Sequence, residues 1–162
     1  MRVRVQRIIH ADPSHVFALF ADANAYAAAH ASRCRSLTYR ADSRTTATTR
    51  EEWLYGGRIY RIRHRVRLIP EKEVKLDTID GIGRGARERV RLEAVPGGCR
   101  VRYEVEFSLP GTLGPILEPI VAVRLRAVIE SLADEDVVAI EQRGRKLATM
   151  RRRIRSEGDR PR

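Results

Sequence analysis

Two alternating runs joined by a pair of glycines constrain this chain most strongly. Residues 44–55 and 58–69 both alternate between side chains of different polarity, and Gly56 and Gly57 lie between them. Alternation with a period of two is typical of a strand with one buried face. A Gly-Gly pair between two such runs indicates a tight hairpin turn. The sequence therefore predicts a long antiparallel hairpin.

The register of this hairpin predicts which side chains share a face. Counting back from the glycines gives three cross-strand pairs, Trp53 with Tyr60, Glu51 with Ile62 and Thr49 with His64. Four arginines occupy the opposite parity, at positions 61, 63, 65 and 67. Burying four unpaired charges would cost more than the ~5–15 kcal/mol that stabilises a whole domain. We therefore predict that the arginines face outward and that the tryptophan, tyrosine and histidine face inward.

The rest of the chain is predicted to form five further strands, two short helices and one long helix. Alternation and turn residues predict strands at 2–10, 36–41, 72–80, 86–95 and 99–109, the last two forming a hairpin around residues 96–98. Helical patterns predict short helices near 13–20 and 23–30 and a long helix over about 116–153, with Pro119 as a candidate for its true start. On the second hairpin we expect outward ion pairs of Glu93 with Arg100, Arg89 with Glu104 and Arg87 with Glu106.

This order of elements predicts an α+β fold. A twisted seven-stranded antiparallel sheet has one face to bury, and a long C-terminal helix laid against that face buries it. Two short helices after the first strand close one end. We expect one domain over residues 1–155, followed by a charged, disordered tail at 156–162.

The opening strand, the segment Ala11-Asp12-Pro13-Ser14-His15-Val16-Phe17, residues 22–26 and the terminal helix together resemble the START-like or SRPBCC superfamily. Polyketide cyclases, coenzyme Q-binding proteins and Bet v 1-like lipid carriers belong to it. The resemblance implies a helix-grip fold with a cavity between the sheet and the long helix.

Six inward side chains are the candidate ligand-binding residues: Glu51, Trp53, Tyr60, His64, Glu88 and Tyr103. The aromatic members would supply apolar contact, and the polar members would orient a polar group of the ligand. A row of polar groups on an otherwise apolar face indicates a cavity that holds water or ligand, because a dry core would exclude them. His64 is alternatively a core histidine satisfied by a neighbouring threonine or glutamate.

The long helix carries an apolar stripe at helical spacing, formed by Leu117, Val121, Leu125, Val128, Leu132, Ala139 and Met150. Glu135 falls on that stripe, where we expect it either at the mouth of the cavity or paired with an arginine such as Arg124. Asp134 and Asp136 flank it and are expected to face solvent.

The segment Glu135-Asp136-Val137 resembles the C-terminal helix in the catalytic domain of Rieske-type oxygenases, where an aspartate ligates iron with two histidines. The four histidines of this chain lack that family's His-x4-His spacing, and no other catalytic signature is present. We therefore predict no metal site, no cofactor and no assigned catalytic residue.

Composition narrows the cellular setting. The formal net charge is +11, yet only three of the 32 basic residues are lysines, so the arginine excess can reflect genomic base composition. Two cysteines fit a reducing compartment, and no apolar run approaches the ~20 residues of a membrane span. We expect a cytoplasmic protein, and the sequence leaves open whether it forms a homodimer.

Three functions fit these features. The leading hypothesis is a non-enzymatic binder or carrier of a hydrophobic small molecule or lipid. The alternatives are an enzyme resembling polyketide cyclases and dehydratases, using His64 with Glu88 or Glu51 with Tyr60, and a ribosome- or RNA-associated protein that uses the basic charge.

Overall fold

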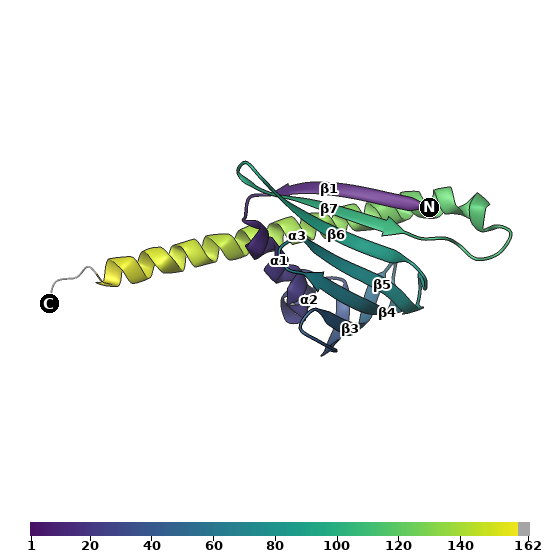
Figure 1. The fold of residues 1–162 in the computed structure, drawn as a ribbon, viewed down its shortest axis with the longest axis horizontal. Coiled ribbons are helices and arrows are strands. Elements are labelled where there is room, and N and C mark those ends of the chain that lie inside the picture. The colour runs from purple at the N-terminus through teal and green to yellow at the C-terminus, as the bar shows by residue number, and fades with distance from the viewer. Residues whose placement is uncertain (159–162) are drawn as a thin grey trace.

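A curved antiparallel sheet wraps around one long helix in the computed structural model of this chain (Figure 1). The structure describes the backbone of residues 1–158 and the side chains of residues 1–114 and 116–146. The elements are β1 (Arg2–Ile9), α1 (Pro13–Ala21), α2 (Ala23–Ala29), β2 (Cys34–Ala41), β3 (Thr46–Tyr55), β4 (Arg58–Ile69), β5 (Glu73–Gly81), β6 (Arg87–Val95), β7 (Gly98–Glu106) and α3 (Gly114–Gly158). The predicted α+β helix-grip fold is confirmed.

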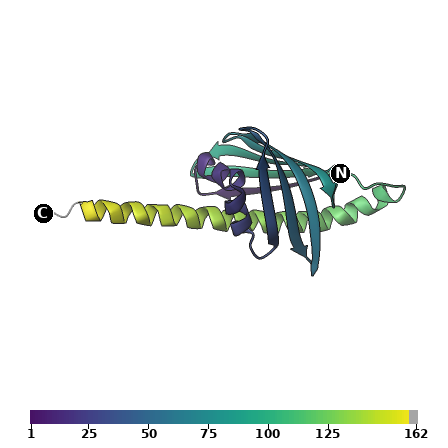
Figure 2. The same ribbon diagram turned by 90° about the horizontal axis from the view of Figure 1, so that it is seen from below.

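The seven strands lie in the order β1-β7-β6-β5-β4-β3-β2, so the first strand pairs with the last. Helix α3 runs alongside the sheet, and α1 and α2 lie together near one end of the strands (Figures 1 and 2). This arrangement leaves a space between the concave face of the sheet and the three helices, and the side chains that fill or line it come from both layers.

Both predicted hairpin registers are confirmed. Trp53 lies opposite Tyr60 and Thr49 opposite His64, while Glu93 lies opposite Arg100. The inward parity of β4 is also confirmed, since His64 is buried whereas the arginine that follows it is exposed. Gly56 and Gly57 both have positive φ, which explains why glycine occupies this turn.

The main core lies where β1, β7 and α3 meet. Its buried members come from β1, β6 and β7, from α1 and α2, and from one face of α3: Val3, Val5, Ile9, Val16, Leu19, Ala25, Leu92, Cys99, Val101, Tyr103, Val105, Ile129, Ala133 and Ile140. Burying each valine, leucine or isoleucine side chain contributes ~1.5–3 kcal/mol. A second, smaller cluster of Ala47, Val66 and Val74 lies on β3, β4 and β5.

Ion pairs cover the outer face of the sheet. Arg61 pairs with Glu52 at 2.9 Å, and Arg100 pairs with Glu93 at 3.1 Å, as the registers predict. The expected partners Arg89 and Arg87 do lie opposite Glu104 and Glu106, but these carboxylates form their ion pairs with Arg2 and Arg4 of β1. Exposed pairs of this kind contribute only ~0–1 kcal/mol each.

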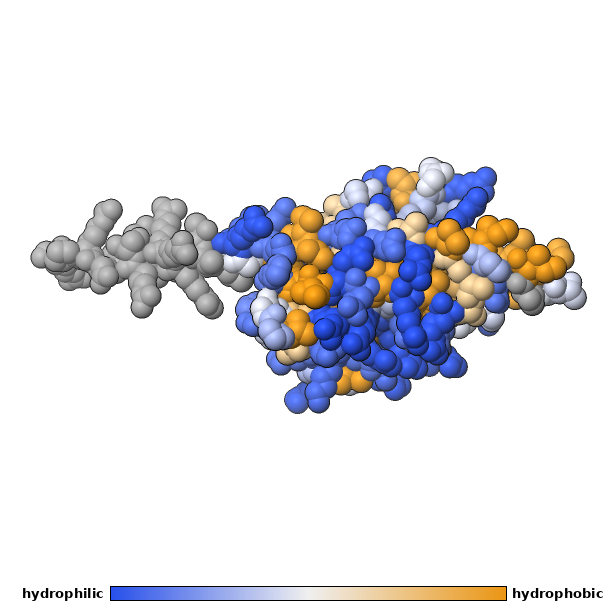
Figure 3. All heavy atoms as spheres, turned by 90° about the horizontal axis from the view of Figure 1, so that it is seen from above, coloured by the Kyte–Doolittle hydropathy of each residue, from blue (hydrophilic) through white to orange (hydrophobic). Residues whose placement is uncertain are grey.

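Helix α3 differs from the prediction at its start. It begins at Gly114 and contains Pro119 inside its first turns, so the proline does not mark the helix start. The side chains around this start are apolar and exposed, and hydrophobic surface is visible at that end of the molecule (Figure 3): Leu113, Ile116, Leu117, Ile120 and Val123. Among the described helices, none has the length and apolar character needed to cross a membrane.

The C-terminal end of the chain is described only in part. Residues 156–158 continue the backbone of α3, and residues 159–162 of the expected disordered tail lie outside the described residues.

Candidate functional site

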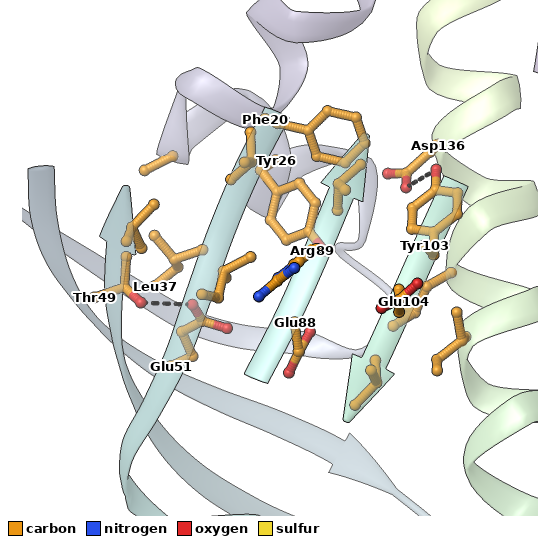
Figure 4. A pocket seen from close by; sticks show the side chains of 18 of the residues that line it. Phe20, Tyr26, Leu37, Thr49, Glu51, Glu88, Arg89, Tyr103, Glu104 and Asp136 are labelled. Carbon is orange, nitrogen blue, oxygen red and sulfur yellow. Dashed lines mark hydrogen bonds between the residues drawn. The ribbon is translucent and has the colours of Figure 1, made fainter. Parts of the chain in front are cut away.

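A pocket of about 110 Å³ lies between the inner face of the sheet and helices α1, α2 and α3. Its wall is mainly apolar and combines residues from the sheet and from all three helices (Figure 4). The lining residues are Phe20, Ala23, Tyr26, Leu37, Tyr39, Thr49, Glu51, Val66, Val74, Leu76, Glu88, Arg89, Val90, Tyr103, Glu104, Val105, Ile129, Leu132 and Asp136. An apolar cavity of about 150 Å³ is known to hold benzene. The pocket in this conformation is smaller than that cavity, so a ring-sized group is the upper limit of what it takes.

Glu51 is buried in one wall of the pocket with both carboxylate oxygens occupied. The Thr49 hydroxyl donates to Oε1 and the Trp53 indole N–H donates to Oε2, each at 2.7 Å. The Nε2 atom of His64 lies 3.9 Å from Oε2, and its Nδ1 atom lies 3.2 Å from the Thr78 hydroxyl. His64 therefore lies between Thr49 and Thr78 on the neighbouring strands, and its ring lies next to the Glu51 carboxylate.

Glu88 on β6 is half-buried and is the carboxyl group in this pocket that lacks a partner. Neither a hydrogen bond nor an ion pair joins it to any other part of the described chain, although it lines the pocket. Burial raises the pKa of the Glu88 carboxyl above its usual value, His64 lowers it and Glu51 raises it further. A carboxyl group in this state holds its proton more readily than a surface glutamate, and it can then both donate and accept a hydrogen bond.

A chain of hydrogen bonds ties α2, β7 and α3 together beside the pocket. The Tyr103 hydroxyl donates to Asp136 Oδ2 at 2.8 Å, and Asp136 Oδ1 lies 3.0 Å from His30 Nε2. The other ring nitrogen of His30 lies 2.7 Å from Glu135, whose second oxygen lies 3.5 Å from Arg33. Helix α2 ends immediately before His30, so the end of that helix aims the imidazole ring at α3.

His30 lies between two carboxylates and is fully buried. Burial alone would lower the pKa of its imidazole, but the hydrogen bonds and charges of Asp136 and Glu135 raise that pKa above its usual value. The protonated ring donates from both nitrogens, which is the arrangement that two flanking carboxylates stabilise. The cluster fixes the position of Tyr103, which forms part of the pocket wall.

Three of the six predicted site residues line the pocket, namely Glu51, Glu88 and Tyr103. Trp53 and His64 are buried and face inward as predicted, but they lie next to the Glu51 carboxylate and are not among the lining residues. Tyr60 is half-buried beside Tyr55, with ring centroids 6.3 Å apart, and also lies outside the lining. The inward parity is thus confirmed for all of them, whereas a role in binding remains a prediction.

The expectation that Asp136 faces solvent is wrong, because 1% of its side chain is exposed, while Asp134 is exposed as predicted. Glu135 pairs with an arginine, as one of the two expectations had it, but the arginine is Arg33 and not Arg124. The buried side chains among the described residues of the helix are Ile129, Ala133, Asp136 and Ile140. Of the predicted stripe, Leu125 packs against the core, Leu132 lines the pocket, and the side chain of Met150 lies outside the described residues.

Sequence patterns did not reveal the contribution of α1 and α2 to the site. Phe20 and Tyr26 line the pocket, and Tyr26 packs edge-on against His30 with ring centroids 4.6 Å apart. One signal in the sequence could have indicated this contribution, namely His30 at the end of an alanine-rich helix. If such a helix is buried, a polar side chain at its end needs hydrogen-bond partners. Within the described residues, no group of three or more histidine, cysteine or acidic side chains could hold a metal ion.

One family model matches most of this chain. The family model described as polyketide cyclase/dehydrase and lipid transport matches residues 1–141. A search of curated proteins finds no match to this chain.

Solved structures share the fold at low sequence identity. The protein TTHA0849 from Thermus thermophilus has a TM-score of 0.77 at 19% identity, with 88% of this chain and 98% of that chain covered. The Zhui aromatase/cyclase from Streptomyces sp. R1128 has a TM-score of 0.66 at 17% identity, with 98% of each chain covered. A START superfamily protein from Mycobacterium smegmatis has a TM-score of 0.71 at 16% identity, with 87% and 97% covered. At these identities the likeness shows a common fold.

Proposed function

Because this chain belongs to the polyketide cyclase/dehydrase and lipid transport family, we propose that it binds a small hydrophobic molecule in the pocket between its sheet and its helices. The observation that carries the proposal is an apolar pocket with an unpaired carboxyl group, Glu88, on its wall. A polar group without a partner in an apolar cavity is costly unless a ligand or water satisfies it. Small-molecule sites commonly combine an apolar lining with a few such polar groups.

The size of the pocket limits the bound group. Typical pockets for drug-sized ligands are about 300–1,000 Å³, which is larger than the 110 Å³ present here. The pocket encloses a ring or a short apolar segment, and a larger ligand requires side chains such as Leu76 and Leu132 to move aside.

Native mass spectrometry tests this proposal. Protein purified without denaturation is expected to retain a bound small molecule, or to take up a ring-sized apolar compound on addition. Leu76→Trp places a larger side chain into the pocket from β5 and should abolish the bound species. Asp77→Trp adds the same side chain one residue along, on the exposed outer face, and should leave it unchanged. Equal binding by both variants would contradict a site in this pocket.

Glu88 also favours a second candidate, a cyclase-like enzyme. A carboxyl group with a raised pKa in an apolar pocket is suited to general acid or base work on a carbonyl compound. Exchange of the α-protons of cyclohexanone in D₂O, followed by NMR, tests this chemistry with a substrate of the right size. Acceleration by the wild-type protein that Glu88→Gln removes would support the enzyme, and exchange at the uncatalysed rate would eliminate it.

Two further parts of the proposal concern the setting of the protein. The ion pairs of the outer face occupy arginines such as Arg61 and Arg100, which favours a small-molecule role over an RNA-associated one. Cys34 and Cys99 are both free thiols, which supports a place in the reducing cytoplasm.

A further inference from the structure

The polar groups that face the pocket are predominantly acidic, although the protein as a whole is strongly basic. Glu51, Glu88 and Asp136 all line it. Of the lining residues, Arg89 alone is basic, and it occupies the outward parity of β6 opposite Glu104. Glu104 in turn pairs with Arg2 and Arg4 on the outer face. An incoming ligand therefore meets carboxyl groups and no inward cation.

Two of these three carboxyl groups have their oxygens occupied. Glu51 accepts from Thr49 and Trp53, and Asp136 lies within hydrogen-bond distance of His30 and Tyr103. Glu88, which has no partner among the described residues, is therefore the carboxyl group with which the polar group of a ligand can form a hydrogen bond.

The Tyr26 hydroxyl also lines the pocket and has no hydrogen-bond partner among the described residues. Its ring extends from α2 into the pocket (Figure 4). Burial, followed by the negative charge of Asp136 and Glu51, holds the pKa of this hydroxyl well above its usual value. The same negative charge acts on anything that enters, and it opposes a second anion.

We propose, building on the function proposed above, that the pocket selects uncharged apolar molecules that present a hydroxyl hydrogen to Glu88, and that it rejects molecules carrying a carboxylate. A carboxylate would enter beside Glu51, Glu88 and Asp136, and the lining offers no inward cation to pair with it, because the His30 ring is already bonded to Asp136 and Glu135. It would also lose its hydration on entry. A hydroxyl can donate to Glu88 and accept from Tyr26. The positive outer surface attracts anions in general, so the discrimination must come from the pocket itself.

A matched set of single-ring probes tests this selectivity: toluene, benzyl alcohol, benzylammonium and benzoate. The indole N–H of Trp53 is the readout, because the chain has one tryptophan and its N–H bonds to Glu51 in the pocket wall. Titrations followed by ¹H–¹⁵N NMR give the dissociation constant of each probe from the shift of that signal. We expect benzyl alcohol to bind about tenfold more tightly than toluene, as one added hydrogen bond allows. Benzoate and benzylammonium should both bind more weakly than either. Benzoate meets carboxyl groups, and benzylammonium loses hydration that a single ion pair with Glu88 does not repay.

Two variants test whether Glu88 causes the difference in affinity between the probes. Glu88→Gln should strengthen benzoate binding about tenfold, because its amide donates to a carboxylate and its negative charge is gone. Glu93→Gln makes the same change on the outer face of the same strand, outside the pocket lining, and should leave the order of the four probes unchanged.

The outcomes separate this inference from the function on which it rests. Benzoate or benzylammonium binding as tightly as benzyl alcohol would overturn the selectivity while leaving the binding function in place. Failure of all four probes to shift the Trp53 signal near their solubility limits would overturn both.

Discussion

Replacing Asp136 by asparagine tests the buried cluster that orders one side of the pocket. Asp136 lies on the buried face of α3 and joins two partners from other elements, His30 after α2 and Tyr103 on β7. Asparagine has nearly the same shape but only one acceptor oxygen. Its amide group must therefore face one of the two donors that the carboxylate now accepts from.

The structure sets the size of the expected loss. Hydrogen bonds to charged groups contribute ~1.5–3 kcal/mol each, and removing one member of a buried charge pair costs ~3–5 kcal/mol. We expect Asp136→Asn to lower the free energy of unfolding by about 4 kcal/mol. This loss is a large part of the ~5–15 kcal/mol of a typical domain but leaves the protein folded.

Urea unfolding measures this loss. With an m value of about 2 kcal/mol/M, the midpoint should fall by about 2 M. The matched control is Asp134→Asn, two residues away on the same helix, where an exposed ion pair with Arg7 contributes only ~0–1 kcal/mol. If Asp136→Asn lowered the free energy of unfolding by only the ~0–1 kcal/mol expected for Asp134→Asn, the buried cluster would be refuted, because neither aspartate would then be enclosed.

Three further predictions follow from single positions. Because burial raises the pKa of Glu88, the free energy of unfolding of the wild-type protein should fall as the pH rises above about 4.5. Urea unfolding should show that Glu88→Gln lacks this fall and is more stable than wild type at pH 7. Because the pKa of His30 is raised, its contribution to the free energy of unfolding is complete below about pH 6.5 and is lost as the pH rises through its pKa in the folded protein. His30→Gln should abolish this loss of stability at higher pH, and an unchanged dependence of stability on pH would contradict the prediction. Gly81→Ala should lower the melting temperature far more than Gly57→Ala, since both have positive φ but a Cβ at Gly81 would overlap the backbone carbonyl of Arg61, whereas the space around Gly57 is open; similar melting temperatures would refute this packing.

The sheet could be predicted closely from the sequence because its rules are local. The glycine turn fixes the pairing of Trp53 with Tyr60, and the period of two then assigns every side chain on both strands to a face. The same parity placed Glu51, Glu88 and Tyr103 on the inner face, where all three line the pocket.

The face of α3 could not be predicted in the same way. Apolar residues occupy more than one stripe of this helix, so Leu125, Val128 and Leu132 satisfied helical spacing as well as Ile129, Ala133 and Ile140 did. Only the partner decides which stripe is buried, and the partner is β1, which is distant in sequence.

The correct choice of stripe carries Asp136 into the core, where a carboxylate is tolerated because His30 and Tyr103 supply its hydrogen bonds. That compensation involves three distant segments and leaves no local pattern.

The pairing of the first strand with the last governs the order in which the molecule can assemble. Strands β2 to β7 join neighbours in sequence, so they can pair as hairpins soon after synthesis, whereas Arg2 of β1 meets Glu106 of β7 across 104 residues. At ~5–20 residues per second, a ribosome needs about 5–20 s to make that segment. During this time the apolar face of β1, with Val3, Val5 and Ile9, has no sheet to join. Closure of β1 against β7 and α3 therefore comes late, and a contact of such long range is expected to set the slowest step of folding.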